Sequence, residues 1–400
     1  MAMNAPAARE VRAPGPVFLR GGFRLLFLLG ATWALVVAAL WIAAFGGHLI
    51  LPTAMDPLAW HQHEMLFGYL SAVVGGFLTA AIPNWTGRPA LSGWPVAGLV
   101  GCWIGARVAI LFSSHVPPLV GWTFDIGFLL ILFVYATREV FAAGNRNKPV
   151  LVVVVLFGTA AAVDHGHALG WFDDGGAGMR AGFALVLLLI ALIGGRIIPA
   201  FTRNWLTAQR PGSRLPAAAD RIDHAALIAL GVALLAWVFE PIEHATAILL
   251  ILAGALHLLR LSRWSGWQTW RAPMVLILHL SYFWLPLGLL LLGASILGTV
   301  VPGSSAVHAL AAGAMGSMTL AVMTRATRGH TGRPLVADKT TVAIYALVLL
   351  GAALRVVAPL LPDIYLISVE MAGAAWGGAF LLFIIVYGPM LLGPRADGKP

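Results

Sequence analysis

The chain has 400 residues, of which 60% are apolar and only 10% are charged, and its formal net charge at pH 7 is +9. A soluble domain typically carries about 25% charged residues, so this composition excludes a water-soluble globular protein. The single cysteine, Cys102, excludes an intrachain disulfide, a zinc ribbon and an iron–sulfur cluster held by this chain alone.

Apolar segments follow one another along the whole chain, each long enough at about 20 residues to cross the hydrocarbon core as a helix. They are 25–46, 61–83, 94–114, 117–138, 149–169, 180–201, 222–240, 244–260, 272–296, 304–324, 340–360 and 364–393. We therefore predict an all-α polytopic membrane helix bundle of about 12 transmembrane helices. The seventh and eighth segments are short, and the intervening Glu240-Pro241-Ile242-Glu243 leaves open a hairpin that does not fully cross.

The distribution of charge predicts an orientation. If the N-terminus is cytoplasmic, the cytoplasmic tails and loops hold every Lys and Arg except Arg107, Arg180 and Arg355. This is the positive-inside pattern. We expect cytoplasmic tails over residues 1–24 and 394–400 around a single transmembrane domain over 25–393. Because the basic residues are divided among short loops, we expect no interaction with nucleic acid.

The sequence also indicates internal repetition. His63 precedes Thr86-Gly87-Arg88-Pro89 by 23 residues, and His308 precedes Thr331-Gly332-Arg333-Pro334 by the same spacing, at an offset of 245. Gly75-Gly76 and Asn84-Trp85 in the second segment are echoed by Gly194-Gly195 and Asn204-Trp205 in the sixth. The second, sixth and tenth segments lie four helices apart, which favours three four-helix repeats. Coincidence among glycine-rich helices stays open.

Histidines gather at one face of the predicted bundle. Eight of the 12 fall at external helix ends or loops, and these are His48, His61, His63, His115, His165, His167, His244 and His308. Imidazole is the commonest metal ligand and suits haem iron and copper, so the group is typical of a metal site. Any single one of these residues can instead be satisfied by interfacial water.

The second segment opens with the densest motif, Trp60-His61-Gln62-His63-Glu64-Met65. On a helix, residues two apart point about 200° apart, so His61 and His63 cannot both ligate one metal from a regular helix. Either they serve different sites or His61 lies in a non-helical cap. Glu64 near the helix N-terminus can also be explained by the helix dipole alone.

Further candidates lie in later segments. His308 and Met315 share a helical stripe but are about 10.5 Å apart, too far for one metal atom. His279 lies inside the ninth segment, where a metal or proton-relay role competes with a structural one. Arg325 is placed to bind an acidic group such as a propionate or phosphate, or to anchor the topology. Asp125 and Asp164 lie near external ends, where they can orient ligating histidines or be solvated.

Four blocks of the sequence together resemble the NnrS family of bacterial haem- and copper-containing membrane proteins. The blocks are Trp60–Gly68 running on to Asn84-Trp85-Thr86-Gly87, Gly195–Asn204, His279–Pro286 and His308–Leu335, and the resemblance extends over nearly the full length. Thr327 and Arg328 depart from the usual family pattern of Ser and Leu.

The resemblance implies binding of haem and copper in a multi-pass protein of the bacterial inner membrane, with nitric oxide or a related small ligand as its partner. It further implies a role in nitric oxide metabolism or nitrosative-stress resistance. The metal ligands we expect are His61, His63, His279, His308 and His167, and the other cofactor contacts are Glu64, Met65, Arg196 and Arg325. The external histidines place the expected metal centre in the periplasmic half of the membrane.

Two other functions stay open at this point: a transporter of copper, haem or a small substrate, and a non-catalytic membrane scaffold. The sequence contains no evident nucleophile–base pair or nucleotide-binding loop, so it predicts no catalytic residue and leaves the question of enzyme activity open. It also leaves open whether the protein forms a homo-oligomer.

Overall fold

The computed structural model describes residues 15–145 and 147–398, and every regular element within them is a helix. Of the predicted tails, residues 1–14 and 399–400 lie outside the described residues. Twelve helices in this part of the chain are long and apolar enough to cross a membrane, so the prediction of an all-α polytopic bundle is confirmed.

The helices follow in chain order with short connections. They are α1 (Gly22–Phe45), α2 (Pro57–His63), α3 (Leu70–Thr86), α4 (Trp94–Leu111), α5 (Pro118–Ala142), α6 (Pro149–Ala168), α7 (Ala177–Gln209), α8 (Arg221–Phe239), α9 (His244–Ser262), α10 (Pro273–Ile296), α11 (Gly303–His308), α12 (Ser317–His330), α13 (Lys339–Val357) and α14 (Tyr365–Leu392). Two π-helical segments, η2 (Glu64–Tyr69) and η4 (Ala309–Gly316), join α2 to α3 and α11 to α12. Short 3₁₀ turns are η1 (Val17–Leu19), η3 (Gly266–Thr269), η5 (Ala358–Leu360) and η6 (Pro362–Ile364).

Helix boundaries settle two questions that the sequence left open. The second span begins at Pro57, because the Asp56 carboxylate accepts hydrogen bonds from the backbone N–H groups of Leu58 and Ala59. His61 is therefore helical rather than part of a cap. The seventh and eighth spans, α8 and α9, each have 19 residues, which is close to the length needed to cross the hydrocarbon core. The partial hairpin is therefore not favoured.

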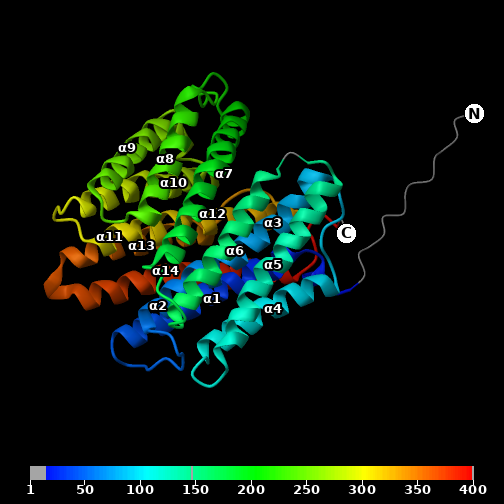
Figure 1. Cartoon of the computed structure of the whole chain (residues 1–400). Coiled ribbons are helices and arrows are strands. Elements are labelled where there is room, and N and C mark those ends of the chain that lie inside the picture. Colours follow the sequence, from blue (N-terminus) through cyan, green and yellow to red (C-terminus); the bar gives the residue numbers. More distant parts are fainter. Residues whose placement is uncertain (1–14, 146, 399–400) are drawn as a thin grey trace, which may run out of the picture.

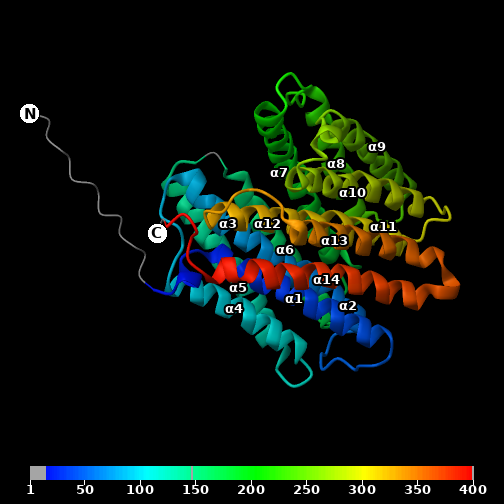
Figure 2. The ribbon, with the colours of Figure 1, turned by 180° about the vertical axis from the view of Figure 1, so that it is seen from behind.

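The loops of the bundle divide between two ends. We call one the histidine-rich end, formed by loops 46–56, 112–117, 169–176, 240–243 and 297–302. The other is the arginine-rich end, formed by loops 87–93, 143–148, 210–220, 263–272 and 331–338. The first described residues and the C-terminal segment both lie at the arginine-rich end (Figures 1 and 2). The Arg24 side chain ties them together by donating to the carbonyl of Gly393 at 2.8 Å.

The repeat at an offset of 245 residues extends into the backbone conformation. His63 ends α2 and His308 ends α11, and a π-helical segment begins at the next residue in each case, Glu64 and Ala309. The two continuing helices then reach a left-handed glycine at the same offset, Gly87 and Gly332. Shared irregularities at one offset favour true repetition over chance, since π-helical segments are rare.

The second and tenth spans form the centre of the bundle. The apolar windows of Pro57–Thr86 and Gly303–His330 are 72% and 67% buried, against 39% for outer spans such as His244–Ser262. Helices α8 and α9 lie on one side of the bundle and α4 and α5 on the other (Figures 1 and 2). The π-helical segments therefore lie in the part of the bundle that is best shielded from lipid.

Glycines let the central helices approach closely, as is common in membrane bundles. A Cβ added at Gly182 of α7 would lie 2.4 Å from the ring of Phe67, which is fully buried in η2. A Cβ at Gly288 of α10 would lie 2.5 Å from the Leu310 side chain in η4. Packing against glycine thus holds both π-helical segments in place.

This packing predicts the effect of enlarging Gly182. Gly182→Val should displace Phe67 and lower the free energy of unfolding by about 1–3 kcal/mol, the usual cost of overpacking. The matched control is Gly98→Val in α4, where an added Cβ meets nothing within 4 Å. Thermal unfolding in detergent should show a lower midpoint for the first variant only. Equal midpoints would contradict the close α7–η2 contact.

Candidate functional site

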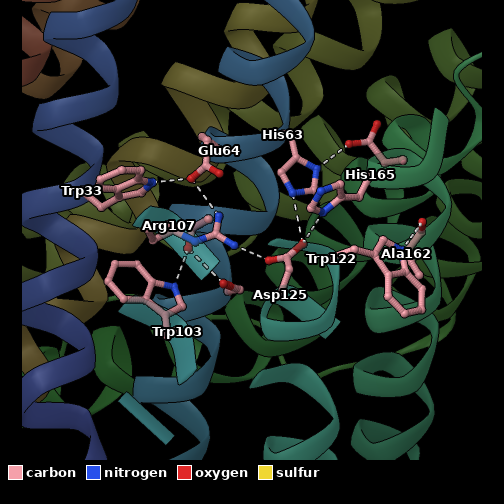
Figure 3. A network of polar contacts seen from close by, with 12 residues as sticks. Trp33, His63, Glu64, Trp103, Arg107, Trp122, Asp125, Ala162 and His165 are labelled. Atoms are coloured by element: carbon pink, nitrogen blue, oxygen red, sulfur yellow. Dashed lines mark hydrogen bonds and ion pairs between the residues drawn. The ribbon is translucent and has the colours of Figure 1, made fainter. Parts of the chain in front are cut away.

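A buried polar cluster lies near the histidine-rich end, between α1, α2, α4, α5 and α6 (Figure 3). We call it the Arg107 cluster, and its members are Trp33, His63, Glu64, Arg107, Asp125, Asp164 and His165. The side chains of His63, Glu64, Arg107 and Asp125 are at most 3% exposed. Charged groups buried to this degree inside a spanning region are costly and are functional candidates by default.

The Arg107 guanidinium bridges the carboxylates of Glu64 and Asp125. Its Nη1 donates to Glu64 Oε2 at 2.7 Å, and its Nη2 donates to Asp125 Oδ1. The guanidinium fork can do this because its donors point in fixed, divergent directions. Its close approach to the helix depends on Gly68, where an added Cβ would lie 2.5 Å from Nη1. Trp33 donates to the same Glu64 oxygen at 2.5 Å.

His63 lies between two carboxylates. Its Nδ1 is 2.8 Å from Asp164 Oδ2, and its Nε2 is 3.1 Å from Asp125 Oδ2. The same Asp125 oxygen lies 3.4 Å from Nδ1 of His165. Potential ligand atoms of His63, Asp125 and His165 thus all lie within 4.8 Å of one another, close enough to hold one metal ion. The three residues come from α2, α5 and α6.

A separate cavity of about 200 Å³ opens on the other side of α2. A single water needs about 10–15 Å³ by the same measure, so the space admits a much larger ligand. We call it the His61–His308 cavity. Its wall is mostly apolar and is made by α1, α2, η2, the start of α3, α7, α11, η4, α13 and α14. Its polar or sulfur-bearing members include Gln62, Met65, Tyr69, Met315 and Arg355.

Both histidines of this cavity are held in defined orientations. The ring of His61 stacks on Trp41 at 4.7 Å, and its Nδ1 is buried with no hydrogen-bond partner among the described residues. His308 donates its Nδ1–H to the carbonyl of Ser304 at 2.7 Å. A carbonyl can only accept, so Nε2 of His308 is the nitrogen left free to bind a ligand.

Each π-helical segment adjoins one or both sites and offers a carbonyl to a tryptophan of a neighbouring helix. Trp103 of α4 donates to Gly68 in η2 at 3.0 Å, and Trp376 of α14 donates to Ala312 in η4 at 3.3 Å. A π-helical turn shifts the backbone register and releases such carbonyls, and it often marks a functional site. Tyr69 and Thr319 then link the two central spans by a hydrogen bond between their hydroxyls.

The structure separates the predicted metal ligands into different environments. His61 and His308 share the cavity, whereas His63 belongs to the Arg107 cluster. His167 is half-exposed near the external loop, with Nδ1 3.2 Å from Asp174 and 3.4 Å from Asp173. His279 lies toward the arginine-rich end of α10, where Nε2 is 2.8 Å from the Thr202 hydroxyl. A single centre formed by all five histidines is therefore not what the fold provides.

The predicted cofactor contacts are likewise divided. Met65 lines the cavity, and Glu64 lies in the Arg107 cluster. Arg325 packs its guanidinium 3.8 Å from the ring centroid of Phe201, toward the arginine-rich end. Arg196 is exposed on α7. Neither Arg196 nor Arg325 lines the cavity, because both lie closer to the arginine-rich end than the cavity residues of the same spans.

Sequence reasoning missed the roles of Arg107 and Arg355. Both are basic residues inside predicted spans, and that position was itself a signal, because an arginine in a span needs a partner. Arg107 has the two carboxylates, whereas Arg355 reaches the cavity with its Nη1 buried and without a partner among the described residues. Asp125 and Asp164, expected to orient histidines, both contact His63.

A second buried ion pair lies in the other half of the bundle and is fully occupied by protein groups. Arg260 donates to Asp223 at 2.8 Å, to the carbonyl of Ala191 and to the Tyr282 hydroxyl. His257 lies 2.8 Å from that hydroxyl and 3.1 Å from the carbonyl of Ala226. This set joins α7, α8, α9 and α10, and its satisfied contacts favour a structural role.

A known family model matches nearly the whole chain. Residues 17–395 match the family model described as NnrS protein. The match includes the Arg107 cluster and every residue named in the wall of the cavity. No curated protein matches the chain.

Removing the cation of the Arg107 cluster should be severely destabilising. Arg107→Leu leaves Glu64 and Asp125 buried without their shared partner, which typically costs about 3–5 kcal/mol. Arg88→Ala is the control, because its pair with Glu139 is partly exposed and worth at most about 1 kcal/mol. Thermal unfolding in detergent should show a large loss for the first variant and a small one for the second. Similar losses would mean that the cluster does not hold the fold.

Proposed function

Because this chain belongs to the NnrS family, we propose that it is a haem- and copper-binding protein of the bacterial inner membrane that acts in nitric oxide metabolism or nitrosative-stress resistance. The observation that carries the proposal is the His61–His308 cavity. It brings together His61 and His308, two imidazoles from different spans that each keep one ring nitrogen without a hydrogen-bond partner among the described residues, at one largely apolar space.

The donor set of the cavity fits a haem. Haem iron takes imidazole or thioether axial ligands, and the cavity offers His61 and His308 together with Met65 and Met315. A porphyrin needs apolar and aromatic walls, and Trp376 supplies part of one. The Nη1 atom of Arg355, which has no hydrogen-bond partner in the described part of the chain, gives a donor for a carboxylate such as a propionate.

The protein contributes orientation. The Ser304 carbonyl fixes the tautomer and the direction of the His308 ring, as outer partners of metal-binding histidines commonly do. Stacking on Trp41 fixes the plane of His61. The apolar wall limits water in the cavity. If one of the two imidazoles held a haem in this cavity, its iron would supply the chemistry that binds nitric oxide.

The orientation in the membrane follows from the charge of the two ends. The arginine-rich end carries most of the basic residues, together with the first and last described residues, so the positive-inside rule favours a cytoplasmic location for it. The cavity and the Arg107 cluster then lie in the periplasmic half of the membrane. This location supports access of a small ligand from the periplasm.

A transporter is the second candidate, and the repeat supports it. Two central spans with matching π-helical interruptions flank the cavity, and interrupted helices in related halves are typical of transporters. Uptake of copper, haem or a small substrate into proteoliposomes, lost on replacing His61 or His308, would favour this candidate. Nitrosative-stress resistance that survives loss of both histidines would instead favour a scaffold.

The haem proposal predicts the spectra of two cavity variants. His61→Ala and His308→Ala should each lower haem affinity at least tenfold, since even outer partners of a metal ligand contribute about 10–100-fold. The measurement is the Soret absorbance and the haem-to-protein ratio of the purified protein. His48→Ala, an exposed histidine at the same end, is the control and should keep its haem.

Two results would contradict the proposal. One is the absence of a Soret band from the unaltered protein purified from cells supplied with iron. The other is an unchanged band in the double variant of His61 and His308. Thermal unfolding of each variant establishes that a lost band is not a lost fold.

A further inference from the structure

The residues of the Arg107 cluster that face away from Arg107 form a compact donor set. His63, Asp125 and His165 contribute two imidazole nitrogens and a carboxylate oxygen within 4.8 Å of one another. All three are buried and come from three different spans (Figure 3). The rings of His63 and His165 lie 4.8 Å apart between centroids. Nε2 of His63 and Nδ1 of His165 both approach the same oxygen of Asp125.

Asp125 divides its two oxygens between two tasks. Oδ1 accepts from Arg107, and Oδ2 faces both histidines, at 3.1 Å from His63 and 3.4 Å from His165. The guanidinium thus fixes the carboxylate without using the oxygen that a cation would need. Arg107 is itself fixed by Glu64, which Trp33 holds in turn. The donor oxygen is therefore preorganised by contacts outside the donor set.

The charges of the cluster leave a negative excess. Glu64, Asp125 and Asp164 are three carboxylates against the single guanidinium of Arg107. Carboxylates accept hydrogen bonds but do not donate when ionised, so each nitrogen of His63 must carry a proton or face a metal ion. A divalent cation among the three donors would balance the excess charge.

The arrangement around His63 is the one that metal-binding histidines commonly have. Its Nδ1 lies 2.8 Å from Asp164, which can hold the Nδ1–H while Nε2 remains a ligand. The ring packs against Phe67 at 5.3 Å between centroids, an apolar contact that limits water. Two imidazoles and a carboxylate suit first-row divalent metals, and among these Cu²⁺ binds most strongly.

We infer that His63, Asp125 and His165 bind one divalent first-row transition metal ion, with Cu²⁺ as the strongest binder and Asp164 orienting His63. This site is distinct from the His61–His308 cavity, because residues 61 and 63 point to opposite sides of α2. The inference rests on the proposed function in one respect: it names the residues that bind the copper of that proposal. It does not depend on haem.

The test is copper binding by the full-length purified protein. The metal-depleted protein is titrated with Cu²⁺ and followed by elemental analysis and electron paramagnetic resonance. We expect one tightly bound Cu²⁺ per chain with hyperfine splitting from two imidazole nitrogens. His165→Gln and Asp125→Asn should weaken binding at least tenfold, and His165→Gln should remove one nitrogen from the splitting.

Two controls locate the ion. His167→Gln changes a residue of α6, the helix that also carries His165, and removes the half-exposed histidine beside Asp173 and Asp174. This variant should bind copper as the unaltered protein does. His308→Ala alters the cavity and should bind haem at least tenfold more weakly while it keeps copper. His165→Gln is the milder of the two site variants, since its only polar contact in the cluster is 3.4 Å long.

Two outcomes would overturn the assignment. Copper bound equally well by His165→Gln and Asp125→Asn would exclude this donor set, as would loss of copper from His167→Gln alone. If the unaltered protein shows no Soret band but binds copper, and the two site variants bind copper more weakly, the haem proposal is removed and the metal site stays in place. The two failures can thus be told apart.

Discussion

The burial of Arg107 among carboxylates is the interaction on which the candidate sites depend. A guanidinium inside a spanning region is tolerated only where its charge is compensated, and Glu64 and Asp125 both accept from it. Through these two carboxylates, Arg107 fixes one turn of the second span and one turn of α5. Because Glu64 begins η2, this ion pair also anchors the π-helical segment next to the cavity.

One helix separates two environments of opposite character. His61 faces an apolar cavity with Trp41 and the side chains of α11 and η4, and His63 faces a polar cluster with Asp125 and Asp164. The 200° rotation between residues two apart makes this division unavoidable on a regular helix. A change at α2 therefore acts on both the cavity and the Arg107 cluster.

The sequence predicted the bundle well because hydrophobic length alone dictates spanning helices. Helical geometry also excluded one metal shared by His61 and His63 on a regular helix, but the sequence left open a non-helical cap at His61. It could not pair Arg107 with Asp125 or Glu64, because such contacts depend on how separate spans pack. The π-helical segments were equally inaccessible: η2 and η4 depend on packing by Gly182, Gly288 and neighbouring tryptophans, which local propensity does not encode. The offset of 245 residues was the one trace of them in the sequence.

The central claim is that two metal-binding sites flank α2, a haem in the His61–His308 cavity and a divalent ion at His63, Asp125 and His165. A cryo-electron microscopy map of the protein purified with its native cofactors tests it most directly. The account predicts planar density between α2 and η4 and a compact peak among the two imidazoles and Asp125. A cavity filled by lipid tails, with His63 contacting only carboxylates, would contradict it.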